Sequence, residues 1–256
     1  MLSIFAFIVS GYKQVAKAET LDVAEGIINE QEEDLGLLLA ILNQLNISAT
    51  EYELECVAQK ELPYMKGHSV FVIPKIVKID DTEYYAATTL DVYILIVENE
   101  TGKIIHHFYE KDSGGEYAVY FEHIEIDTAP YRLNNDTRAF GVRVSYNAHS
   151  RLHPYLREEI SLFIPYGNLL VRVLKDYGID GYRGEWDDHC EGEFIRTRSI
   201  LTMSKEQTNG FYNIDVESTI ENTVISLFDE DGWDCDTEET VTQSSQTLRY
   251  IDGEYK

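Results

Sequence analysis

Basic residues are scarce in this sequence of 256 residues. Lys and Arg together number 21 against 46 Asp and Glu, which gives a formal net charge of −25 and an isoelectric point near 4.5. A field of this sign repels the phosphate backbone of nucleic acids and the anionic surface of a membrane. The same field attracts basic proteins, peptides and cations. We therefore expect no nucleic-acid partner. A basic protein or peptide is the candidate partner, and the alternative is that the charge serves solubility alone.

Long hydrophobic runs are missing beyond the first residues. The apolar run from Leu2 to Val9 is followed by a polar stretch and by Ala16-Lys17-Ala18, an A-x-A pattern of the kind that signal peptidase cuts. No later segment approaches the roughly 18 consecutive apolar residues of a membrane helix. These features predict a signal peptide at residues 1–18, a mature chain without a membrane span, and a periplasmic or secreted location. The alternative for residues 1–18 is an ordinary amphipathic helix.

Cysteine is limited to Cys56, Cys190 and Cys235. The last two end similar stretches, GEWDDHC and DGWDC, each with Trp-Asp shortly before the cysteine. In an oxidising compartment these two are the predicted disulfide pair. Cys56 is then expected to be a small buried hydrophobe.

The sequence also lacks the short signatures of catalysis. There is no G-x-S-x-G motif, no P-loop and no dinucleotide-binding fingerprint. Paired carboxylates of the glycosidase kind remain open in so acidic a chain, but their abundance singles out no pair. The sequence therefore predicts no catalytic residue and favours a protein that binds over an enzyme.

What the sequence does contain is a large apolar fraction arranged as strands. Hydrophobic residues make up 44%, including 18 Tyr and 10 Phe, which is enough for a substantial core. Residues 20–45 show helical spacing of apolar positions, whereas short β-branched runs between turn residues follow from about Val70. We expect a helical lead-in at residues 19–65 and an all-β domain at residues 66–256. The domain should be a mainly antiparallel β-repeat body, either propeller-like or a sandwich.

Two segments give more detail. Residues 91–98 (DVYILIVE) form a continuous apolar run, typical of a strand buried on both faces, and the turn at residues 99–102 predicts a hairpin to residues 103–109. In residues 139–146, Phe140, Val142 and Val144 alternate with smaller or polar residues. This alternation predicts one apolar face and one face in contact with solvent.

Three segments carry a family resemblance. Residues 91–108 (DVYILIVENETGKIIHHF) and 159–174 (EISLFIPYGNLLVRVL) both read as strand, Gly-containing polar turn and strand, and residues 247–256 (TLRYIDGEYK) read as a closing strand. On these segments, residues 85–256 resemble exported bacterial β-repeat proteins of the propeller kind, integrin-type repeats among them. The resemblance implies repeated β units. It implies no site residue, because no calcium-loop signature of the repeat type is intact.

An acidic segment is the first candidate site. Between Lys205 and Arg249 there are eleven Asp or Glu residues and no basic residue. Its densest part offers the oxygen ligands that calcium prefers, and the candidate ligands are Asp229, Asp231, Asp234 and Asp236. The spacing does not match an EF-hand, and a solvated acidic loop is the alternative. Calcium is the one cofactor that the sequence suggests.

A basic band is the second candidate site. Residues 137–157 contain four arginines and no acidic residue: Arg138, Arg143, Arg151 and Arg157. Guanidinium groups suit carboxylates and phosphates, so the band could bind an anion. The alternative is that these arginines pair internally with the acidic C-terminal strands. Trp186 and Trp233, beside the predicted disulfide, complete the candidate binding residues.

These observations favour an exported acidic protein that binds a basic protein or peptide. Two alternatives remain: an envelope hydrolase that acts on glycan or peptidoglycan through acidic residues, and a structural domain stabilised by calcium. A cleft that holds two close carboxylates, one with a raised pKa, would favour the hydrolase.

Overall fold

The computed structural model describes residues 35–48, 50–52, 54–82, 85–114, 120–148, 150–228 and 234–256. The predicted signal peptide and the first part of the helical lead-in lie outside the described residues. The description begins with a helix at residues 35–45, followed by a 3-10 turn, Leu54–Cys56.

The rest of the chain is mostly β-strand, so a mainly β body behind a short N-terminal helix is confirmed. Strand pairing starts at residue 58, within the segment expected as helical lead-in. The strands are β1 (Ala58–Glu61), β2 (His68–Thr82), β3 (Tyr85–Glu98), β4 (Ile104–Gly114), β5 (Tyr120–Arg132), β6 (Arg138–Ala148), β7 (Tyr155–Tyr166), β8 (Leu169–Trp186), β9 (Gly192–Thr208), β10 (Phe211–Leu227), β11 (Cys235–Leu248), β12 (Tyr250–Ile251) and β13 (Glu254–Tyr255).

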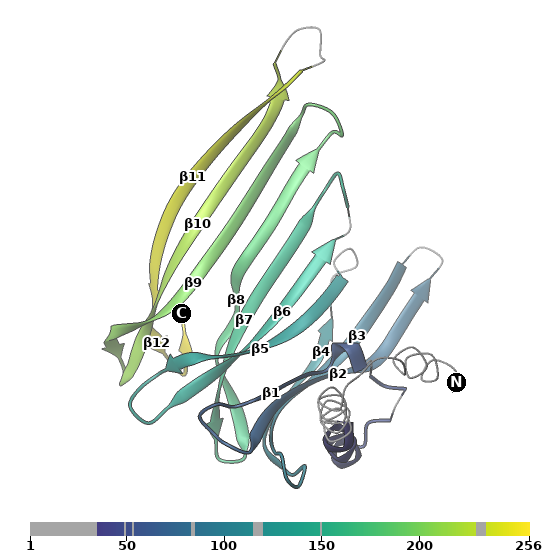
Figure 1. Ribbon diagram of the computed structural model, residues 1–256, viewed down its shortest axis with the longest axis vertical. Helices are drawn as coiled ribbons and strands as arrows, with labels where there is room; N and C mark the ends of the chain where they lie inside the picture. Colours follow the sequence, from purple (N-terminus) through teal and green to yellow (C-terminus); the bar gives the residue numbers. More distant parts are fainter. Residues whose placement is uncertain are drawn as a thin grey trace, which may run out of the picture.

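Eleven strands join one continuous sheet, and the blades of a propeller do not form among the described residues. The order is β1-β2-β3-β4-β8-β7-β6-β5, and β9, β10 and β11 follow from β8 (Figure 1). Neighbours are antiparallel except β4 and β8, which meet in parallel at the single pair His107 and Leu169. The eight-stranded part curls until its outer strands approach, and Lys60 of β1 donates a hydrogen bond to the carbonyl oxygen of Ile126 in β5 at 2.9 Å. This part, β1 to β8, is called the curled sheet below.

The three remaining strands, β9, β10 and β11, form a long extension on the far side of β8, called the outer sheet below (Figure 1). The strand β9 pairs with residues 180–186 of β8, and β10 pairs with both β9 and β11. The strand β11 is the edge of the sheet. It pairs with β10 over its full length without a register shift, and almost all of its side chains are exposed.

Two apolar clusters explain why residues 92–97 of β3 are continuously apolar. Inside the curled sheet, Ile94 and Ile96 pack with residues of β5, β6 and β7. On the other face of β3, Leu95 and Val97 pack under the helix at residues 35–45. The prediction of a strand buried on both faces is therefore confirmed, as is its hairpin with β4. The turn residue Gly102 has a φ of 69° and lies so close to this helix that a Cβ would come within 3.0 Å of the Cβ of Ala40.

A third cluster attaches the outer sheet to the curled sheet. It joins buried residues of β5 to β8, such as Leu162 and Leu174, to Ile214 and Val216 of β10 and to Tyr255 of the C-terminal hairpin. Apolar packing therefore holds the end of β9 around Met203 and the start of β10 around Ile214. Among the described residues, only Leu248 at the end of β11 joins this cluster, and most other side chains of β11 are exposed.

The strand β6 differs from its prediction. Its second face was expected to contact solvent, but Gly141 and Ser145 on that face are buried. A Cβ at Gly141 would lie 2.8 Å from Cδ1 of Ile160 and 3.1 Å from the Cβ of Asp127. The prediction was wrong because the third cluster packs on this face through Ala139, and because the side chains of Ile160 and Asp127 close in on Gly141.

Candidate functional site

The curled sheet encloses a cavity of about 280 Å³, called the interior cavity below. Its lining is apolar over β2, β3, β5 and most of β6, and polar over β4, β7 and β8. The apolar lining residues are Val72, Pro74, Leu90, Val92, Ile94, Phe121, Ile124, Val142, Val144 and Phe163. The polar ones are Glu110, Tyr146, Arg157, Glu159, Ser161, Arg172 and Asp176. The five charged residues among them are called the charged wall.

Strand alternation places much of this lining. Alternate residues of a strand share a face, so Arg157, Glu159, Ser161 and Phe163 of β7 all enter the cavity. The neighbouring strand β6 contributes its own alternate residues in register with them, and Val144 lies opposite Glu159. The polarity changes along β7, because the charged residues come first and Phe163 comes last. Over the cavity as a whole, the charged residues lie on β4, β7 and β8, and the apolar residues lie mainly on β2, β3, β5 and β6.

The most completely paired group of the charged wall is Arg172. Its two terminal nitrogens donate to the two carboxylate oxygens of Glu110 at 2.9 and 2.8 Å. The guanidinium also lies 5.2 Å from the centre of the Phe108 ring. A bidentate pair of this kind uses the planar fork of arginine and the two oxygens of the carboxylate together. Neither partner is therefore readily available to a ligand.

A second carboxylate, Asp176, is fixed by the neighbouring strand. Ser161 donates its hydroxyl to Oδ1 of Asp176 at 3.0 Å, and the backbone N–H of Asp176 donates to the same hydroxyl oxygen at 3.0 Å. Arg172 lies 3.7 Å from the same Oδ1. Asp176 has a φ of 43°, in the left-handed region, where β8 is irregular in its pairing with β7. The bend directs its carboxylate towards β7.

The third carboxylate, Glu159, is less well compensated. The Nε atom of Arg157 lies 3.4 Å from its Oε1, and the Arg157 guanidinium lies 4.8 Å from the centre of the Tyr146 ring. Burial raises the pKa of Glu159, Arg157 lowers it and Asp176 raises it, and the net pKa lies above the ordinary value. A raised pKa means that the site disfavours the carboxylate anion. The charged wall thus holds three carboxylates and two guanidinium groups.

Only one arginine of the predicted basic band, Arg157, lines the cavity. Arg138 donates to the carbonyl oxygen of Thr128 at 2.9 Å and lies over the Tyr64 ring. Arg151 binds Asp188 and lies 5.6 Å from the centre of the Trp186 ring. These side chains do not converge on one anion site. Their partners lie near them in the sheet and not on the acidic C-terminal strands.

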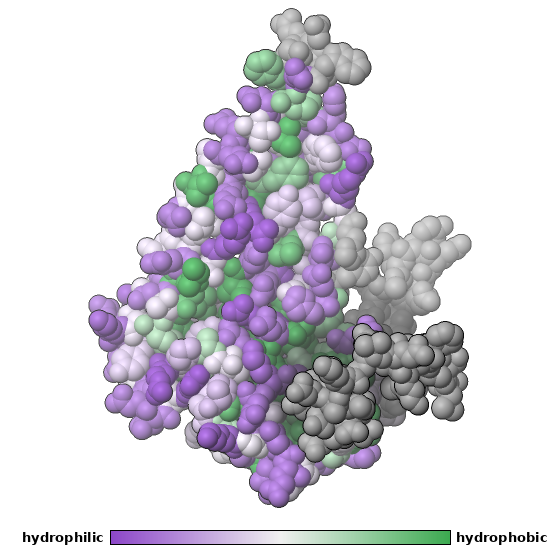
Figure 2. All heavy atoms as spheres, in the orientation of Figure 1, coloured by the Kyte–Doolittle hydropathy of each residue, from purple (hydrophilic) through white to green (hydrophobic). Residues whose placement is uncertain are grey.

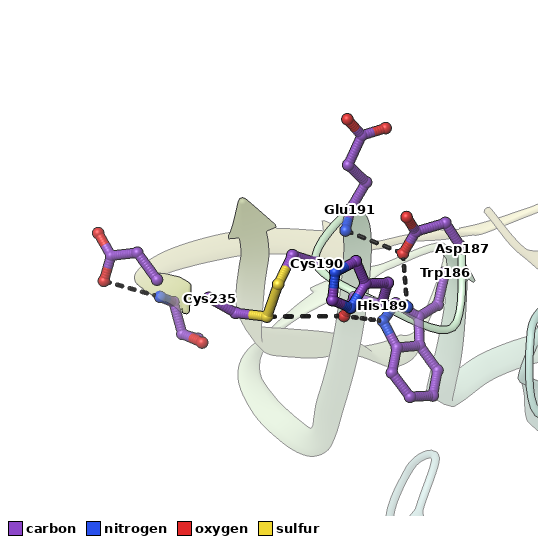
Figure 3. The surroundings of a disulfide bond; sticks show 8 residues. Trp186, Asp187, His189, Cys190, Glu191 and Cys235 are labelled. Atoms are coloured by element: carbon purple, nitrogen blue, oxygen red, sulfur yellow. Dashed lines mark hydrogen bonds between the residues drawn. A yellow bond between two sulfur atoms is a disulfide. The ribbon is translucent and has the colours of Figure 1, made fainter. Parts of the chain in front are cut away.

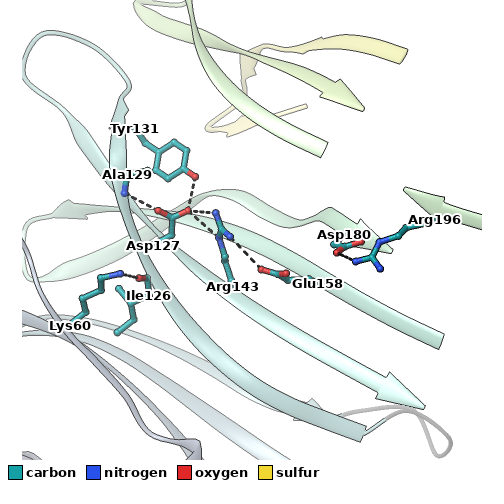
Figure 4. Close-up of polar contacts among 9 residues, drawn as sticks. All are labelled: Lys60, Ile126, Asp127, Ala129, Tyr131, Arg143, Glu158, Asp180 and Arg196. Atoms are coloured by element: carbon teal, nitrogen blue, oxygen red, sulfur yellow. Dashed lines mark hydrogen bonds and ion pairs between the residues drawn. The ribbon is translucent and has the colours of Figure 1, made fainter. Parts of the chain in front are cut away.

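The fourth arginine of the band, Arg143, belongs to a partly buried polar cluster (Figure 4). Its Nε and Nη2 donate to Oδ2 of Asp127 at 3.1 and 2.7 Å, and Glu158 lies 3.6 Å away. Asp127 also accepts hydrogen bonds from the backbone N–H of Ala129 at 2.8 Å and from the hydroxyl of Tyr131 at 2.9 Å. The cluster ties β5, β6 and β7 together, and it faces away from the interior cavity.

The predicted disulfide is confirmed. Cys190 and Cys235 are bonded, with their Cα atoms 5.2 Å apart, and they join the β8–β9 turn to the start of β11 (Figure 3). In that turn Asp187 accepts hydrogen bonds from the backbone N–H of His189 and Glu191 at 2.8 and 2.9 Å. These two donors lower the pKa of Asp187.

Of the two tryptophans predicted as binding residues, only Trp186 lies among the described residues. Trp186 donates from its indole N–H to the carbonyl oxygen of His189 at 3.1 Å, so it helps to shape the turn that carries the disulfide (Figure 3). Trp233 lies outside the described residues. Cys56 was expected to be buried, but its side chain is only half-buried, and it stays outside the disulfide.

The predicted calcium ligands are described only in part. Asp229 and Asp231 lie outside the described residues. Asp236 accepts a hydrogen bond from the backbone N–H of Thr237 at 2.9 Å, and the carbonyl oxygen of Asp234 accepts one from Phe228 at 2.9 Å. Within the described ranges no group of three or more His, Cys, Asp or Glu residues is arranged to hold a metal ion. Calcium binding stays a prediction.

Sequence reasoning did not single out Glu110, Glu159, Ser161, Arg172 or Asp176. One signal was present, because residues 157–163 place two charged residues on the same face of a strand as Phe163. Charged residues in register with a buried aromatic side chain indicate a polar group that faces the interior. The contributions of β4 and β8 left no comparable signal, since they depend on long-range pairing.

No protein-family model, no curated protein and no solved structure matches this chain. The resemblance to exported β-repeat proteins therefore stays a prediction. In the part of the chain that the structure describes, no helix is long and apolar enough to cross a membrane.

Proposed function

We propose that this chain is a non-catalytic binding protein that holds a small, largely apolar molecule in the interior cavity. The observation that supports this is the divided lining, in which ten apolar side chains from five strands share the cavity with the charged wall. Protein interiors are normally filled to the density of organic crystals, whereas ligand sites are apolar hollows with a few polar groups. At about 280 Å³ the cavity lies at the small end of ligand sites, which favours a small molecule.

A cavity-filling variant tests this proposal. Val144→Phe adds a ring to the lining, and we expect it to weaken the binding of the neutral fluorophore N-phenyl-1-naphthylamine about tenfold, as an overpacked site would. The matched control is Val224→Phe, the same change at a residue of β10 that is 39% exposed. Equal fluorophore affinity in wild type and both variants would place the bound fluorophore elsewhere and remove the support for the cavity.

A hydrolase is the second candidate, because the wall contains two carboxylates that influence each other, Glu159 and Asp176, and the pKa of Glu159 is raised. Glycosidases use such a pair as acid and as base or nucleophile. The ten apolar residues of the lining argue against a sugar, which needs many hydrogen-bond partners. Asp176 is moreover already bound by Ser161. Release of reducing sugar from peptidoglycan by wild type, lost in Glu159→Gln, would replace the binding proposal with this one.

The outer sheet supports docking of a basic protein or peptide as a further part of the proposal. Asp236, Glu238 and Glu239 are exposed on β11, and Glu217 is exposed on β10. Figure 2 shows polar side chains over much of the surface in this region. A lysine-rich peptide should bind at low salt, and binding should weaken in the double variant Glu238→Lys/Glu239→Lys. The control, Glu55→Lys/Glu100→Lys, changes the net charge equally at exposed residues outside the outer sheet.

Export to the periplasm or the exterior is proposed on the A-x-A pattern at Ala16–Ala18 and on the disulfide, since disulfides persist in oxidising compartments. The intact mass of the protein made from its full gene tests this. A mass that matches cleavage after Ala18, reduced by two hydrogens, supports export. A mass that retains residues 1–18 and three thiols contradicts it.

A further inference from the structure

One of the two guanidinium groups of the charged wall, that of Arg172, has little capacity left for an anionic ligand. Arg172 donates from both terminal nitrogens to Glu110. Arg157 is shared between the carboxylate of Glu159 and the face of the Tyr146 ring. At Arg172 a ligand carboxylate would have to displace Glu110. Anywhere on the wall it would add a negative charge where carboxylates already outnumber guanidinium groups.

The carboxylates, by contrast, have acceptor capacity left. The side chain of Glu159 is 18% exposed, and its ion pair with Arg157 is 3.4 Å long. From the described part of the chain it receives no hydrogen bond. The Oδ2 atom of Asp176 has Lys175 at 4.0 Å, while its hydrogen bond from Ser161 goes to Oδ1. An ionised carboxylate accepts several hydrogen bonds, and a largely buried one without donors is costly.

From this arrangement we infer that the interior cavity binds an amphipathic amine, with its ammonium group against Glu159 and Asp176 and its apolar body along Val144 and Ile124. The inference rests on the proposed function of the cavity. An ammonium group carries three donors on one compact centre, which suits two carboxylates that lie on one wall. Its charge also balances the excess carboxylate.

Three ligands with the same eight-carbon chain test the inference by isothermal titration calorimetry at neutral pH: octylamine, octan-1-ol and octanoate. The amine is protonated under these conditions, as a lysine side chain is. We expect octylamine to bind roughly tenfold more tightly than octan-1-ol, and octanoate to bind most weakly, because a charged hydrogen bond contributes more than a neutral one.

Variants then locate the charge that matters. Glu159→Gln keeps the shape of the side chain and removes its charge, so octylamine affinity should fall about tenfold while octan-1-ol affinity changes less than about twofold. The matched control is Glu158→Gln. Glu158 is the next residue of the same strand, lies outside the cavity lining and pairs with Arg143 at 3.6 Å. This variant should leave the affinity of all three ligands unchanged.

The outcomes separate the inference from the proposed function. If octan-1-ol and octylamine bind equally, or if octanoate binds most tightly, the amine is the wrong class of ligand while the cavity still binds apolar molecules. If Glu158→Gln weakens octylamine as much as Glu159→Gln does, the charge acts through the sheet and not at the site, and the inference fails. If none of the three ligands binds and N-phenyl-1-naphthylamine does not bind either, the proposed function fails as well.

Discussion

The side chain of Asp127 links β5 to β6 in addition to the backbone pairing of the two strands. It is 8% exposed and accepts hydrogen bonds from Ala129, Tyr131 and Arg143. Burial raises its pKa, but these donors lower it by more, and the net pKa lies below the ordinary value of 3.8. The folded state therefore favours the carboxylate anion, and the charge of Asp127 contributes to stability at neutral pH.

Replacing this carboxylate should cost stability. Asp127→Asn leaves Arg143 with Glu158 at 3.6 Å as its remaining acidic partner. We expect a loss of about 2–3 kcal/mol in the free energy of unfolding, in the range of a charged hydrogen bond that becomes unsatisfied. Urea unfolding measures it. The control is Glu221→Gln, which breaks the exposed pair with Arg198 and should cost under about 1 kcal/mol. Equal losses would show that Asp127 behaves as a surface residue.

The same variant should differ from wild type in its dependence on pH. Because the folded pKa of Asp127 is depressed, its stabilisation is fully present above the unfolded pKa, near 4, and is lost as the pH falls through the folded pKa. The difference in unfolding free energy between wild type and Asp127→Asn should therefore shrink when the pH is lowered from 7 to 3. A difference that grows with acid would reverse the assigned direction of the pKa.

At the scale of elements, the disulfide determines how β11 is attached. It closes a sequence separation of 45 residues, from the β8–β9 turn to the start of β11. In the chain-entropy account a loop of this length stabilises by up to roughly 4 kcal/mol. We expect the double variant Cys190→Ser/Cys235→Ser to lose most of that free energy of unfolding. The loss should be measured as a lower urea midpoint.

Two comparisons support this measurement. Cys56→Ser leaves the disulfide intact and should change the urea midpoint little. A reductant should lower the midpoint of wild type and of Cys56→Ser, and should leave the double variant unchanged. If the reductant has no effect on wild type, the disulfide does not limit unfolding.

Sequence patterns predicted the strands and the disulfide better than they predicted which residues pack on each face of a strand. The apolar run of residues 91–98 was correctly read as a strand buried on both faces, and the paired Trp-Asp stretches pointed to Cys190 and Cys235. The alternation in β6 showed which residues share a face, but not what covers that face. The cover comes from Asp127 on the neighbouring strand and from residues such as Ile214, far along the chain.

The charged wall could not be predicted from the sequence for a related reason. Arg172 and Asp176 lie on a part of β8 that pairs irregularly with β7, with several register shifts, so a period of two does not apply. Glu110 reaches Arg172 because β4 and β8 lie beside each other, yet they meet at a single backbone pair. Glu110 and Arg172 are 62 positions apart, and a single backbone pair between their strands brings them together. Such a contact leaves no local pattern in the sequence.

At the scale of the whole molecule, net charge is the dominant property. With a formal charge of −25, self-repulsion opposes the compact state, and dissolved salt screens it. We expect the melting temperature to rise by a few degrees when sodium chloride is raised from low to physiological concentration. A fall in melting temperature would mean that internal ion pairs, such as Arg172 with Glu110, outweigh the repulsion.

Calcium chloride at matched ionic strength extends this measurement. Screening alone should give the same melting temperature as sodium chloride. A further rise with calcium that is lost in Asp234→Asn/Asp236→Asn would support the calcium prediction, because that variant removes two of the four predicted ligands.

The outer sheet is fastened at both ends, and this changes how it can open. At one end the disulfide joins Cys235 to the β8–β9 turn. At the other, the ring of Tyr250 lies 4.1 Å from that of Phe211, and Tyr255 donates its hydroxyl to the carbonyl oxygen of Tyr212 at 2.7 Å. An edge strand ordinarily frays from a loose end, but β11 has none. Its backbone amides should therefore exchange with deuterium through opening of the whole outer sheet, in step along the strand, even though nearly every side chain of β11 faces water.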